Sequence, residues 1–433
     1  MQDSRRATPR TDRVLADPRL REAADRLGRP LVKRAVTRAL DRCRAGEVDP
    51  DDVAAAALAD QPPVATALRR DVNATGVLVH TNLGRAPLSS AAVDALGVAA
   101  GATDVELDLG TGRRGRRGRS AMAALAAAVP DAGGVHVVNN GAAALALVTC
   151  ALAMGRTVVV SRGELVEIGD GFRIPELLES VGARLREVGT TNRVRLADYA
   201  SAIDDETAFV LKVHPSNFRV SGFTSAVPVA ELATLPVPVV VDIGSGLLAP
   251  HPRLPDEPSA FAALRAGADL VTASGDKLLG GPQCGLMLGR ADLVEALRRH
   301  PFARALRVDK LTLAALEATL TGPPPPVTAA LAASPAALME RARAIAERLA
   351  GSVEASAVAS EAAVGGGGAP GLTLTSAAVA VPEHLAEPLR LGEPPVVGRV
   401  ERGRLLLDLA AVAPAEDDLL VDAVLTAAKS ARG

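Results

Sequence analysis

The chain has 433 residues, 48% hydrophobic and 23% charged, with a formal net charge of −2, which predicts a globular protein with one large domain and one or two smaller ones. Its three cysteines (Cys43, Cys150 and Cys284) form no close-spaced pair, which argues against a disulfide framework and a zinc site, so no metal is expected. The N-terminus is too polar and Arg-rich for a signal peptide and the longest apolar run, 142–154, is too short to cross a bilayer, so we expect a cytoplasmic protein that makes no membrane contact.

The first 65 residues predict a separate helical domain. Apolar residues recur at helical spacing over 13–27 and 30–43, and a third, short helix is expected over 49–59. Residues 1–45 hold 13 Arg or Lys against 6 Asp or Glu, a local net charge of +7. Such a basic end can attract an anionic polymer, but charge alone favours an ordinary solvated helical face.

From about residue 66 to 320 the pattern becomes that of a large α/β domain. Strands are expected at 135–138, 157–161, 184–188, 208–213, 237–241, 270–273 and 285–288. Continuous apolar strands separated by helices predict a mostly parallel sheet that is covered on both faces. In such sheets the active site lies at the carboxyl ends of the strands, where this chain places its polar clusters.

Residues 321–433 predict a small α+β domain, which follows a linking helix at 311–320. Helices are expected near 335–350 and 416–429, and strands near 372–374, 396–400 and 405–409. The glycine run 365–368 is interpreted as a flexible loop.

One lysine stands out chemically. Lys277 follows the strand 270–273 and the break Ser274-Gly-Asp276, on a short loop between two buried strands. Burial favours the neutral amine, which is a nucleophile toward carbonyls, and pyridoxal phosphate (PLP) is the usual aldehyde. The alternative is a lysine that only extends from the loop into solvent.

Two further strand ends suit PLP. Asp242 ends a buried strand 35 residues before Lys277 and could pair with the pyridinium nitrogen, or it could merely cap a helix. The stretch Asn139-Asn-Gly141-Ala142-Ala143 opens an Ala-rich helix whose free amides could bind the phosphate, although Asn-Gly turns are common.

Several arginines lie near predicted loops. Arg304 and Arg307, at spacing i, i+3, are expected to share one helix face, and with Arg85 they could hold a tetrahedral oxyanion. A solvated Arg-rich helix is the alternative. The basic cluster 113–119 is interpreted as a flexible loop that could touch phosphate.

Polar groups also follow other strands and are expected to surround the same pocket. They are Ser161-Arg-Gly-Glu164, Gly189-Thr190-Thr191-Asn192 and Lys212-Val-His214-Pro-Ser-Asn217, each of which could instead be a turn or helix cap. His214 could lie against the cofactor ring, or be a buried, hydrogen-bonded histidine. Cys284 is interpreted as a packing residue.

With these residues assembled, the sequence resembles the bacterial selenocysteine synthases, the L-seryl-tRNA(Sec) selenium transferases. The resemblance runs from about residue 10 to the end. It is carried by the stretches 73–85 (NATGVLVHTNLGR), 161–169 (SRGELVEIG), 188–193 (VGTTNR), 212–217 (KVHPSN), 274–283 (SGDKLLGGPQ), 306–320 (LRVDKLTLAALEATL) and 394–399 (PPVVGR). Two positions depart from the family's usual pattern: Asp170 replaces a glycine and Cys284 an alanine.

The resemblance implies a fold-type-I PLP-dependent transferase with Lys277 as the aldimine lysine and Asp276 beside it as a second catalytic residue. It also implies that Arg85, Arg304 and Arg307 hold the selenophosphate. From the strand-end pattern we expect the cofactor to be bound by Asp242, Gly141, Ala142, Ala143, His214 and Asn217, and the substrate also by Thr190 and Thr191. Seryl-tRNA(Sec) would react through a PLP aldimine and an aminoacrylyl intermediate, to which selenophosphate adds selenium. The N-terminal helices would bind the tRNA, and the enzyme would be a homodecamer.

Two other functions remain open at this stage. One is a PLP-dependent lyase of the same superfamily that acts on a small amino acid or amino sugar acid, which would not need the basic N-terminal helices. The other is a non-catalytic tRNA-binding protein, against which Lys277 and Asp242 argue.

Overall fold

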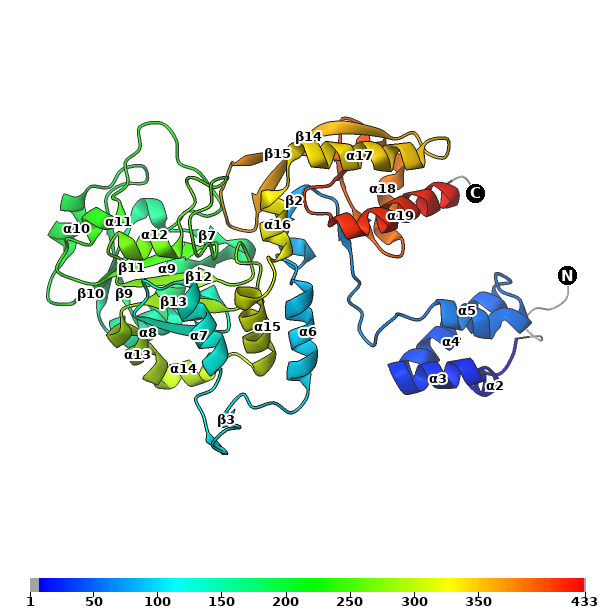
Figure 1. Cartoon of the computed structure of the whole chain (residues 1–433), viewed down its shortest axis with the longest axis horizontal. Helices are drawn as coiled ribbons and strands as arrows, with labels where there is room; N and C mark the ends of the chain where they lie inside the picture. Colours follow the sequence, from blue (N-terminus) through cyan, green and yellow to red (C-terminus); the bar gives the residue numbers. More distant parts are fainter. Residues whose placement is uncertain (1–7, 432–433) are drawn as a thin grey trace. The chain divides into compact units, whose positions relative to one another are not determined.

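The computed structural model describes residues 8–431, and the chain divides after Arg70 into two compact units. The first unit contains α2 (Thr11–Leu15), α3 (Pro18–Leu27), α4 (Arg29–Arg44), the 3-10 turn η1 (Pro50–Asp52) and α5 (Val53–Ala59) (Figure 1). Its own apolar core includes Leu20, Val36 and Leu40, each almost fully buried. The unit is therefore a small helical body with its own core.

The single helix expected over 13–27 is wrong, because the chain breaks after Leu15. Asp17 caps the next helix by accepting a hydrogen bond from the amide of Arg19 at 2.9 Å, and Pro18 occupies the first helical position. A proline there suits a helix start but lacks the amide that a continuous helix requires.

The second unit is built on a seven-stranded sheet, and all seven strands expected from the sequence are confirmed. They are β5 (Gly134–Val138), β6 (Thr157–Ser161), β9 (Arg184–Val188), β10 (Thr207–Val213), β11 (Val239–Gly244), β12 (Leu270–Ser274) and β13 (Gly285–Gly289), in the spatial order β5-β13-β12-β11-β10-β6-β9. Only β13 runs antiparallel to its neighbours. The carboxyl ends of the other six strands therefore meet at one edge.

Successive strand residues point to opposite faces of this sheet and enter two separate cores. Val239 and Val241 belong to one core and Val240 to the other. The first face is covered by α7 (Arg119–Ala128), α10 (Leu196–Ala202), α11 (Val229–Leu232), α12 (Ala260–Arg265) and α15 (Lys310–Thr321). The second is covered by α8 (Gly141–Ala153), α9 (Ile174–Ser180), α13 (Ala291–Arg299) and α14 (Pro301–Ala305). This is the α/β sandwich that the continuous apolar strands predicted.

Around this sandwich lie shorter elements. They are η2 (Thr81–Leu83), α6 (Ser90–Ala100) against α15, the hairpin β3 (Leu107–Asp108) and β4 (Arg113–Arg114), η3 (Arg162–Glu164), β7 (Glu167–Ile168), η4 (Gly169–Gly171) and β8 (Phe172–Arg173). The expectation of a flexible loop at 113–119 is wrong. Arg114 and Arg117 both pair with Glu106, and Arg119 begins α7, so ion pairs and a hairpin order this basic stretch. The side chain of Asp170 lies outside the described part of the chain.

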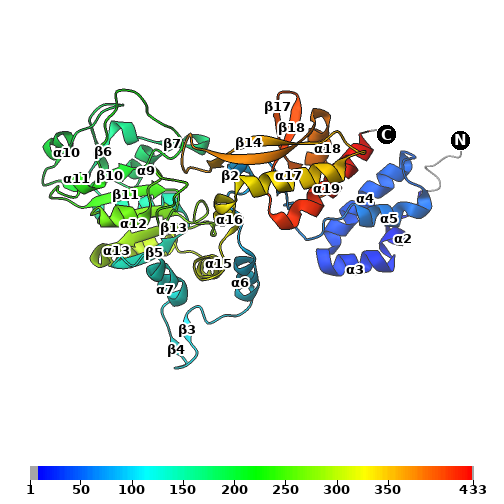
Figure 2. The ribbon, with the colours of Figure 1, turned by 45° about the horizontal axis from the view of Figure 1, so that its top comes forward.

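The C-terminal part of the chain, from residue 326 on, supplies four strands of a second sheet, whose order is β17-β18-β15-β14-β2 and whose fifth strand, β2, comes from residues 77–79 (Figure 2). Its elements are α16 (Pro326–Ala332), α17 (Pro335–Leu349), β14 (Ser356–Gly365), β15 (Thr373–Pro382), η5 (Glu383–Leu385), α18 (Ala386–Leu391), β16 (Val396–Val397), β17 (Arg399–Glu401), β18 (Arg404–Asp408), η6 (Pro414–Glu416) and α19 (Asp417–Ser430). The expected helices and the strand near 405–409 are confirmed. However, β14 was not predicted, and β15 is far longer than the expected 372–374.

Residues 72–79 pair with strands of the C-terminal part of the chain. β2 (Val77–Val79) joins the five-stranded sheet parallel to β14, and β1 (Val72–Asn73) forms a separate two-stranded parallel sheet with β16. The division of the chain into 1–65, 66–320 and 321–433 stays a prediction. The pairing of β2 with β14 shows that residues 77–79 belong to the C-terminal sheet, although they precede every strand of the large sheet in the sequence.

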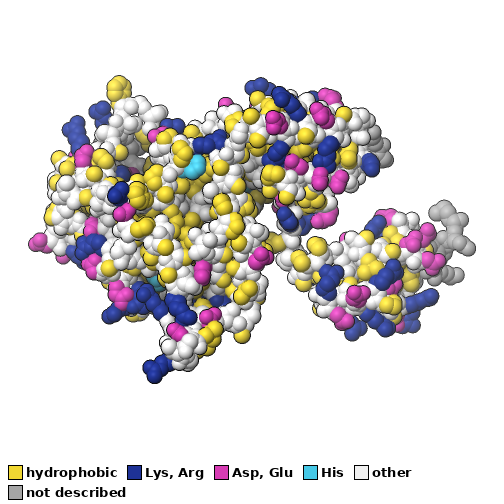
Figure 3. Space-filling model, viewed as in Figure 1, with side chains coloured by type: hydrophobic (Ala, Val, Ile, Leu, Met, Phe, Trp, Pro, Cys, Tyr) yellow, Lys and Arg dark blue, Asp and Glu magenta, His cyan; other side chains and the backbone are white. Residues whose placement is uncertain are grey.

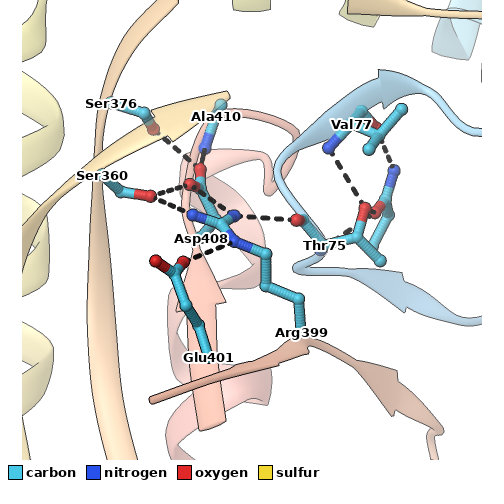
Figure 4. Close-up of polar contacts among 9 residues, drawn as sticks. Thr75, Val77, Ser360, Ser376, Arg399, Glu401, Asp408 and Ala410 are labelled. Carbon is cyan, nitrogen blue, oxygen red and sulfur yellow. Dashed lines mark hydrogen bonds and ion pairs between the residues drawn. The ribbon is translucent and has the colours of Figure 1, made fainter. Parts of the chain in front are cut away.

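A buried ion pair connects residue 75 to the C-terminal sheet. Asp408 on β18 is fully buried and lies 3.1 Å from Nη1 of Arg399, which also donates to the carbonyl of Thr75 at 2.9 Å (Figure 4). Ser360 and Ser376 donate to the same carboxylate. The segment before Arg85 is thus tied to the C-terminal sheet by charge-assisted hydrogen bonds.

No helix among residues 8–431 combines the length and the apolar character that crossing a membrane requires.

Candidate active site

Lys277 lies at the carboxyl edge of the large sheet, in the turn between β12 and β13. Its side chain is partly buried, and burial lowers the pKa of its amine below the usual range even though Asp242 and Asp276 oppose that shift. A lowered pKa increases the neutral, nucleophilic fraction of the amine. Cys284 opposite is buried, and burial raises the pKa of its thiol to about 12, which agrees with a packing role.

Asp242 lies on the neighbouring strand β11. Its carboxylate is buried and accepts a hydrogen bond from the hydroxyl of Thr272 at 2.8 Å. Burial raises the pKa of Asp242, while the hydrogen bond and the charge of Lys277 act in the other direction. A buried carboxylate of this kind is stabilised by a cation beside it, and the protonated nitrogen of a pyridinium ring would be one.

Asp276 and Arg85 are brought together, although 191 residues separate them. Nη1 of Arg85 lies 2.6 Å from Oδ2 of Asp276, and the amide of Ala86 donates to the Asp276 carbonyl at 3.2 Å. Arg85 has a φ of 68°, in the left-handed region that non-glycine residues seldom adopt. The Arg85 side chain is 35% exposed, so it remains accessible to an anion, and its charge acts on the amine of Lys277.

The N-terminus of α8 is the candidate phosphate site. Asn140 caps this helix by accepting from the amide of Ala143 at 2.8 Å, which takes one of the three predicted amides. The amides of Gly141 and Ala142 meet no acceptor among the described residues. A Cβ added to Gly141 would lie 2.7 Å from Oγ of Ser274, so that hydroxyl also borders the helix end. Two open amides and a hydroxyl suit a phosphate.

His214 and Asn217 follow β10, and their side chains are held in different ways. Nε2 of His214 lies 3.2 Å from Oε2 of the buried Glu257. Asn217 donates to the carbonyl of Glu167 at 2.9 Å and is exposed. His214 is therefore fixed at the strand end next to Asp242, whose carbonyl accepts its backbone amide.

Thr190 and Thr191 line a cavity of about 520 Å³ together with His214. The same cavity contains Lys212, whose ammonium is paired with Glu164 at 2.8 Å. Three of the polar strand ends expected from the sequence, within 161–164, 189–192 and 212–217, thus line one cavity, which contains neither Lys277 nor Asp242.

Arg304 and Arg307 lie elsewhere in the chain, and the expectation that they share one helix face is wrong. α14 ends at Ala305, so Arg307 lies outside it. The chain has to leave α14 before residue 309, because Asp309 caps the next helix, α15, by accepting a hydrogen bond from the amide of Thr312. Both arginines still line one cavity of about 400 Å³, which contains neither Lys277 nor Asp242. Its other basic residues are Arg116, Arg117, Arg298, Arg299, His136 and His300. Figure 3 shows Lys and Arg side chains gathered over α14.

Two residues at the site were not predicted. Ser274 was visible in the sequence as a hydroxyl three residues before the lysine, at the end of a buried strand. Glu257 gave no signal, since it is a lone carboxylate in the loop Pro255-Asp-Glu-Pro258 and only the fold brings it to His214.

The residues present fit PLP. The site offers an amine with a lowered pKa, a buried carboxylate, and two open amides with a hydroxyl at the N-terminus of a 13-residue helix. These are the groups that the aldehyde, the ring nitrogen and the phosphate of PLP require.

Comparison with known proteins agrees with this geometry. Residues 72–413 match the family described as L-seryl-tRNA selenium transferase, and residues 5–44 match the family described as selenocysteine synthase N terminal. This chain belongs to the L-seryl-tRNA selenium transferase family. The roles of the individual residues above stay predictions.

Curated relatives cover nearly the whole chain. The L-seryl-tRNA(Sec) selenium transferase of Hyphomonas neptunium is 42% identical over 93% of this chain and 94% of the relative. That of Carboxydothermus hydrogenoformans is 40% identical over 95% of both chains, and that of Moorella thermoacetica 44% over 84% and 83%. Among solved structures, a D-glucosaminate-6-phosphate ammonia-lyase matches with a TM-score of 0.59 at 20% identity, over 84% of this chain and 97% of that one. At that identity the likeness concerns the fold alone.

Proposed function

We propose that this protein converts L-seryl-tRNA(Sec) to L-selenocysteinyl-tRNA(Sec) in the cytoplasm, with PLP held on Lys277 and selenophosphate as the selenium donor. The observation that carries the proposal is the 40–44% identity to selenium transferases over most of the chain, N-terminal unit included. A lyase acting on a small amino acid or amino sugar acid would not need that unit. A protein that only binds tRNA would not need a buried Asp242 that interacts electrostatically with a lysine whose pKa is lowered.

The chemistry at the sheet edge divides among a few residues. Lys277 would hold the cofactor through Nζ and, when released, take the proton from the seryl Cα, because its lowered pKa keeps the amine partly neutral. Asp242 would face the ring nitrogen, and Gly141, Ala142 and Ser274 the phosphate. PLP, when bound, supplies the electron sink for the negative charge left at Cα. His214, fixed by Glu257, would lie against the ring.

The selenium donor is an anion, and the site's arginines suit it. Asp276 holds Arg85, whose charge acts on the amine of Lys277. Thr190 and Thr191 add hydroxyls to the cavity that also contains His214. Arg304 and Arg307 line a different cavity of the same chain. In the proposed homo-oligomer, a decamer on the family resemblance, a second subunit brings these two arginines to the site.

The N-terminal unit would bind the tRNA. Among residues 8–431 no carboxylate pairs with the exposed side chains of Arg21, Arg29, Lys33 and Arg34, three of which lie in the first turns of α4. Other arginines of the unit, such as Arg38, are neutralised by nearby acids. Unpaired cations on one small body are what phosphate contacts require.

The direct test supplies the purified protein and PLP with seryl-tRNA(Sec) and radioactive selenophosphate. Selenocysteinyl-tRNA should form, and neither free L-serine nor an amino sugar acid should be consumed. Turnover of a small amino acid without any label on the tRNA would favour the lyase instead.

Deleting residues 1–60 should separate recognition from chemistry. The truncated protein should keep the cofactor's visible absorption band, because the proposed pocket lies wholly after residue 70. Its tRNA affinity should fall and the salt dependence of binding should flatten, because fewer phosphates are neutralised. Replacing Arg29, Lys33 and Arg34 by Ala is the milder version that keeps the helices. Equal affinity and salt slope in full-length and truncated protein would contradict this role.

A further inference from the structure

The glycine run 365–368 lies at a loop, as expected from the sequence, and this loop is packed against the candidate site. It forms the tip of the β14–β15 hairpin, together with Ala369, and we call residues 365–369 the glycine tip. Gly367 has a φ of +80° and Ala369 one of +45°. A Cβ added to Gly367 would lie 3.0 Å from Nζ of Lys277 and 3.5 Å from Oγ of Ser216. The tip of the C-terminal sheet is therefore packed directly against the candidate catalytic amine.

One buried carboxylate holds this tip. The side chain of Glu257 is fully buried, and its Oε2 accepts a hydrogen bond from the amide of Ala369 at 2.6 Å. The same oxygen lies 3.2 Å from Nε2 of His214. Oε1 of Glu257 has no hydrogen-bonding partner among the described residues. A fully buried carboxylate with so few partners is expensive to maintain, which indicates a role beyond packing.

Glu257 also belongs to the charges that surround Lys277. The charged groups that influence this amine are Asp242, Asp276, Arg85 and Glu257, and the histidine nearest to Asp242 is His214. The carboxylates of this group favour the ammonium form, while Arg85 and burial favour the neutral amine. Removing the charge of Glu257 therefore moves the pKa of Lys277 further down.

We propose that Glu257 is a positioning residue that clamps the glycine tip of the C-terminal sheet over Lys277 and, through the same carboxylate oxygen, couples that tip to His214. The clamp restricts the access of water to the amine and joins the two sheets at the site. It acts through other residues, since no contact of Glu257 with Lys277 is present among the described residues. The inference goes beyond the proposed reaction and does not depend on the identity of the substrate.

The test uses the full-length protein without cofactor. The chain has five lysines, so the reaction of each amine can be followed separately. Labelling of each amine by a small acylating reagent is followed by mass spectrometry, and amide hydrogen exchange is measured across the glycine tip. Lys33 and Lys429, both exposed, serve as internal references. Lys212, paired with Glu164 near the same sheet edge, reports any general loosening. The matched control is Glu361→Ala, an exposed carboxylate on β14.

In Glu257→Ala the amide of Ala369 should exchange about tenfold faster, since a hydrogen bond to a charged acceptor is lost. Lys277 should be labelled several-fold faster relative to the references, while Lys212 stays unchanged. Glu257→Gln keeps an oxygen for the Ala369 amide but has no charge. It should preserve the protection of that amide and shift the pH profile of Lys277 labelling to lower pH.

Unchanged Lys277 labelling in Glu257→Ala, or a parallel rise at Lys212, would overturn the clamp. If the alanine variant does not fold, the glutamine variant decides by itself, and an unshifted pH profile then counts against the proposal. Glu361→Ala should behave as wild type in every measurement.

Discussion

Replacing Arg399 by Met tests the ion pair that ties the two sheets together. Asp408 is fully buried, and with Arg399 gone its carboxylate keeps, among the described residues, the hydroxyls of Ser360 and Ser376 and the amide of Ala410. Removing one partner of a buried pair costs about 3–5 kcal/mol. Because three neutral donors remain and the Arg399 side chain is 29% exposed, we expect the lower end, about 3 kcal/mol.

The assay is amide hydrogen exchange along β14, β15 and β18, which reports the free energy of opening of the C-terminal sheet by itself. Urea unfolding followed by far-UV circular dichroism gives a second measurement. The matched control is Arg402→Met, three residues away, whose side chain is 92% exposed and 3.9 Å from Glu401. That change should stay within about 0.5 kcal/mol.

The double variant Arg399→Met, Asp408→Asn should cost less than the sum of its single changes, because it leaves no unpaired buried charge. If the free energy of opening were the same in Arg399→Met and in the Arg402→Met control, the Arg399–Asp408 pair would not be what holds residues 73–77 to the C-terminal sheet.

Three other predictions follow from the site and its surroundings. Lys277→Ala should abolish the cofactor band that borohydride makes permanent, and fixation of PLP to another of the five lysines would show that the anchor lies elsewhere. Arg304→Ala with Arg307→Ala should abolish selenium transfer but leave PLP and seryl-tRNA bound, each change removing a charge-assisted contact worth about 1.5–3 kcal/mol; unchanged selenophosphate dependence would move the anion site elsewhere. Burial and two nearby guanidinium groups lower the pKa of His136 to about 4, below the 6.5 of the unfolded chain, so its contribution to stability is present above pH 6.5 and is lost as pH falls to 4. His136→Gln should flatten the pH dependence of unfolding in that window by up to about 3 kcal/mol, and an unaltered pH profile would show that the histidine is not held neutral.

Most of the large sheet could be predicted because its strands, apart from β9 (Arg-Leu-Arg-Glu-Val), are continuous apolar runs. A run such as Val239–Gly244 fits a strand covered on both faces, and few other structures bury it as well. The break after β12 that presents Lys277, and the aspartate that ends β11, follow from the same pattern. Local sequence thus places Lys277 and Asp242 at strand ends, and the rule for parallel sheets brings those ends to one edge.

The C-terminal sheet was predicted less well. β14 reads Ser-Ala-Val-Ala-Ser-Glu-Ala-Ala-Val-Gly, which is rich in small residues with little strand preference. It is a strand because β15 pairs with it along eight residues and β2 pairs with its other edge. Pairing with β2 depends on a segment nearly 300 residues earlier, which no local pattern can reveal.

The sequence by itself determined which residue types carry the chemistry: a lysine and carboxylates at strand ends, and glycines where the backbone must turn. Only the tertiary structure decided which of them meet. It joined Arg85 to Asp276, and it placed Glu257 and the glycine tip beside His214 and Lys277. The physical reason is that strand formation depends on nearby apolar residues, whereas a buried charge is tolerated only where the fold supplies its partner, and that partner can lie anywhere in the chain.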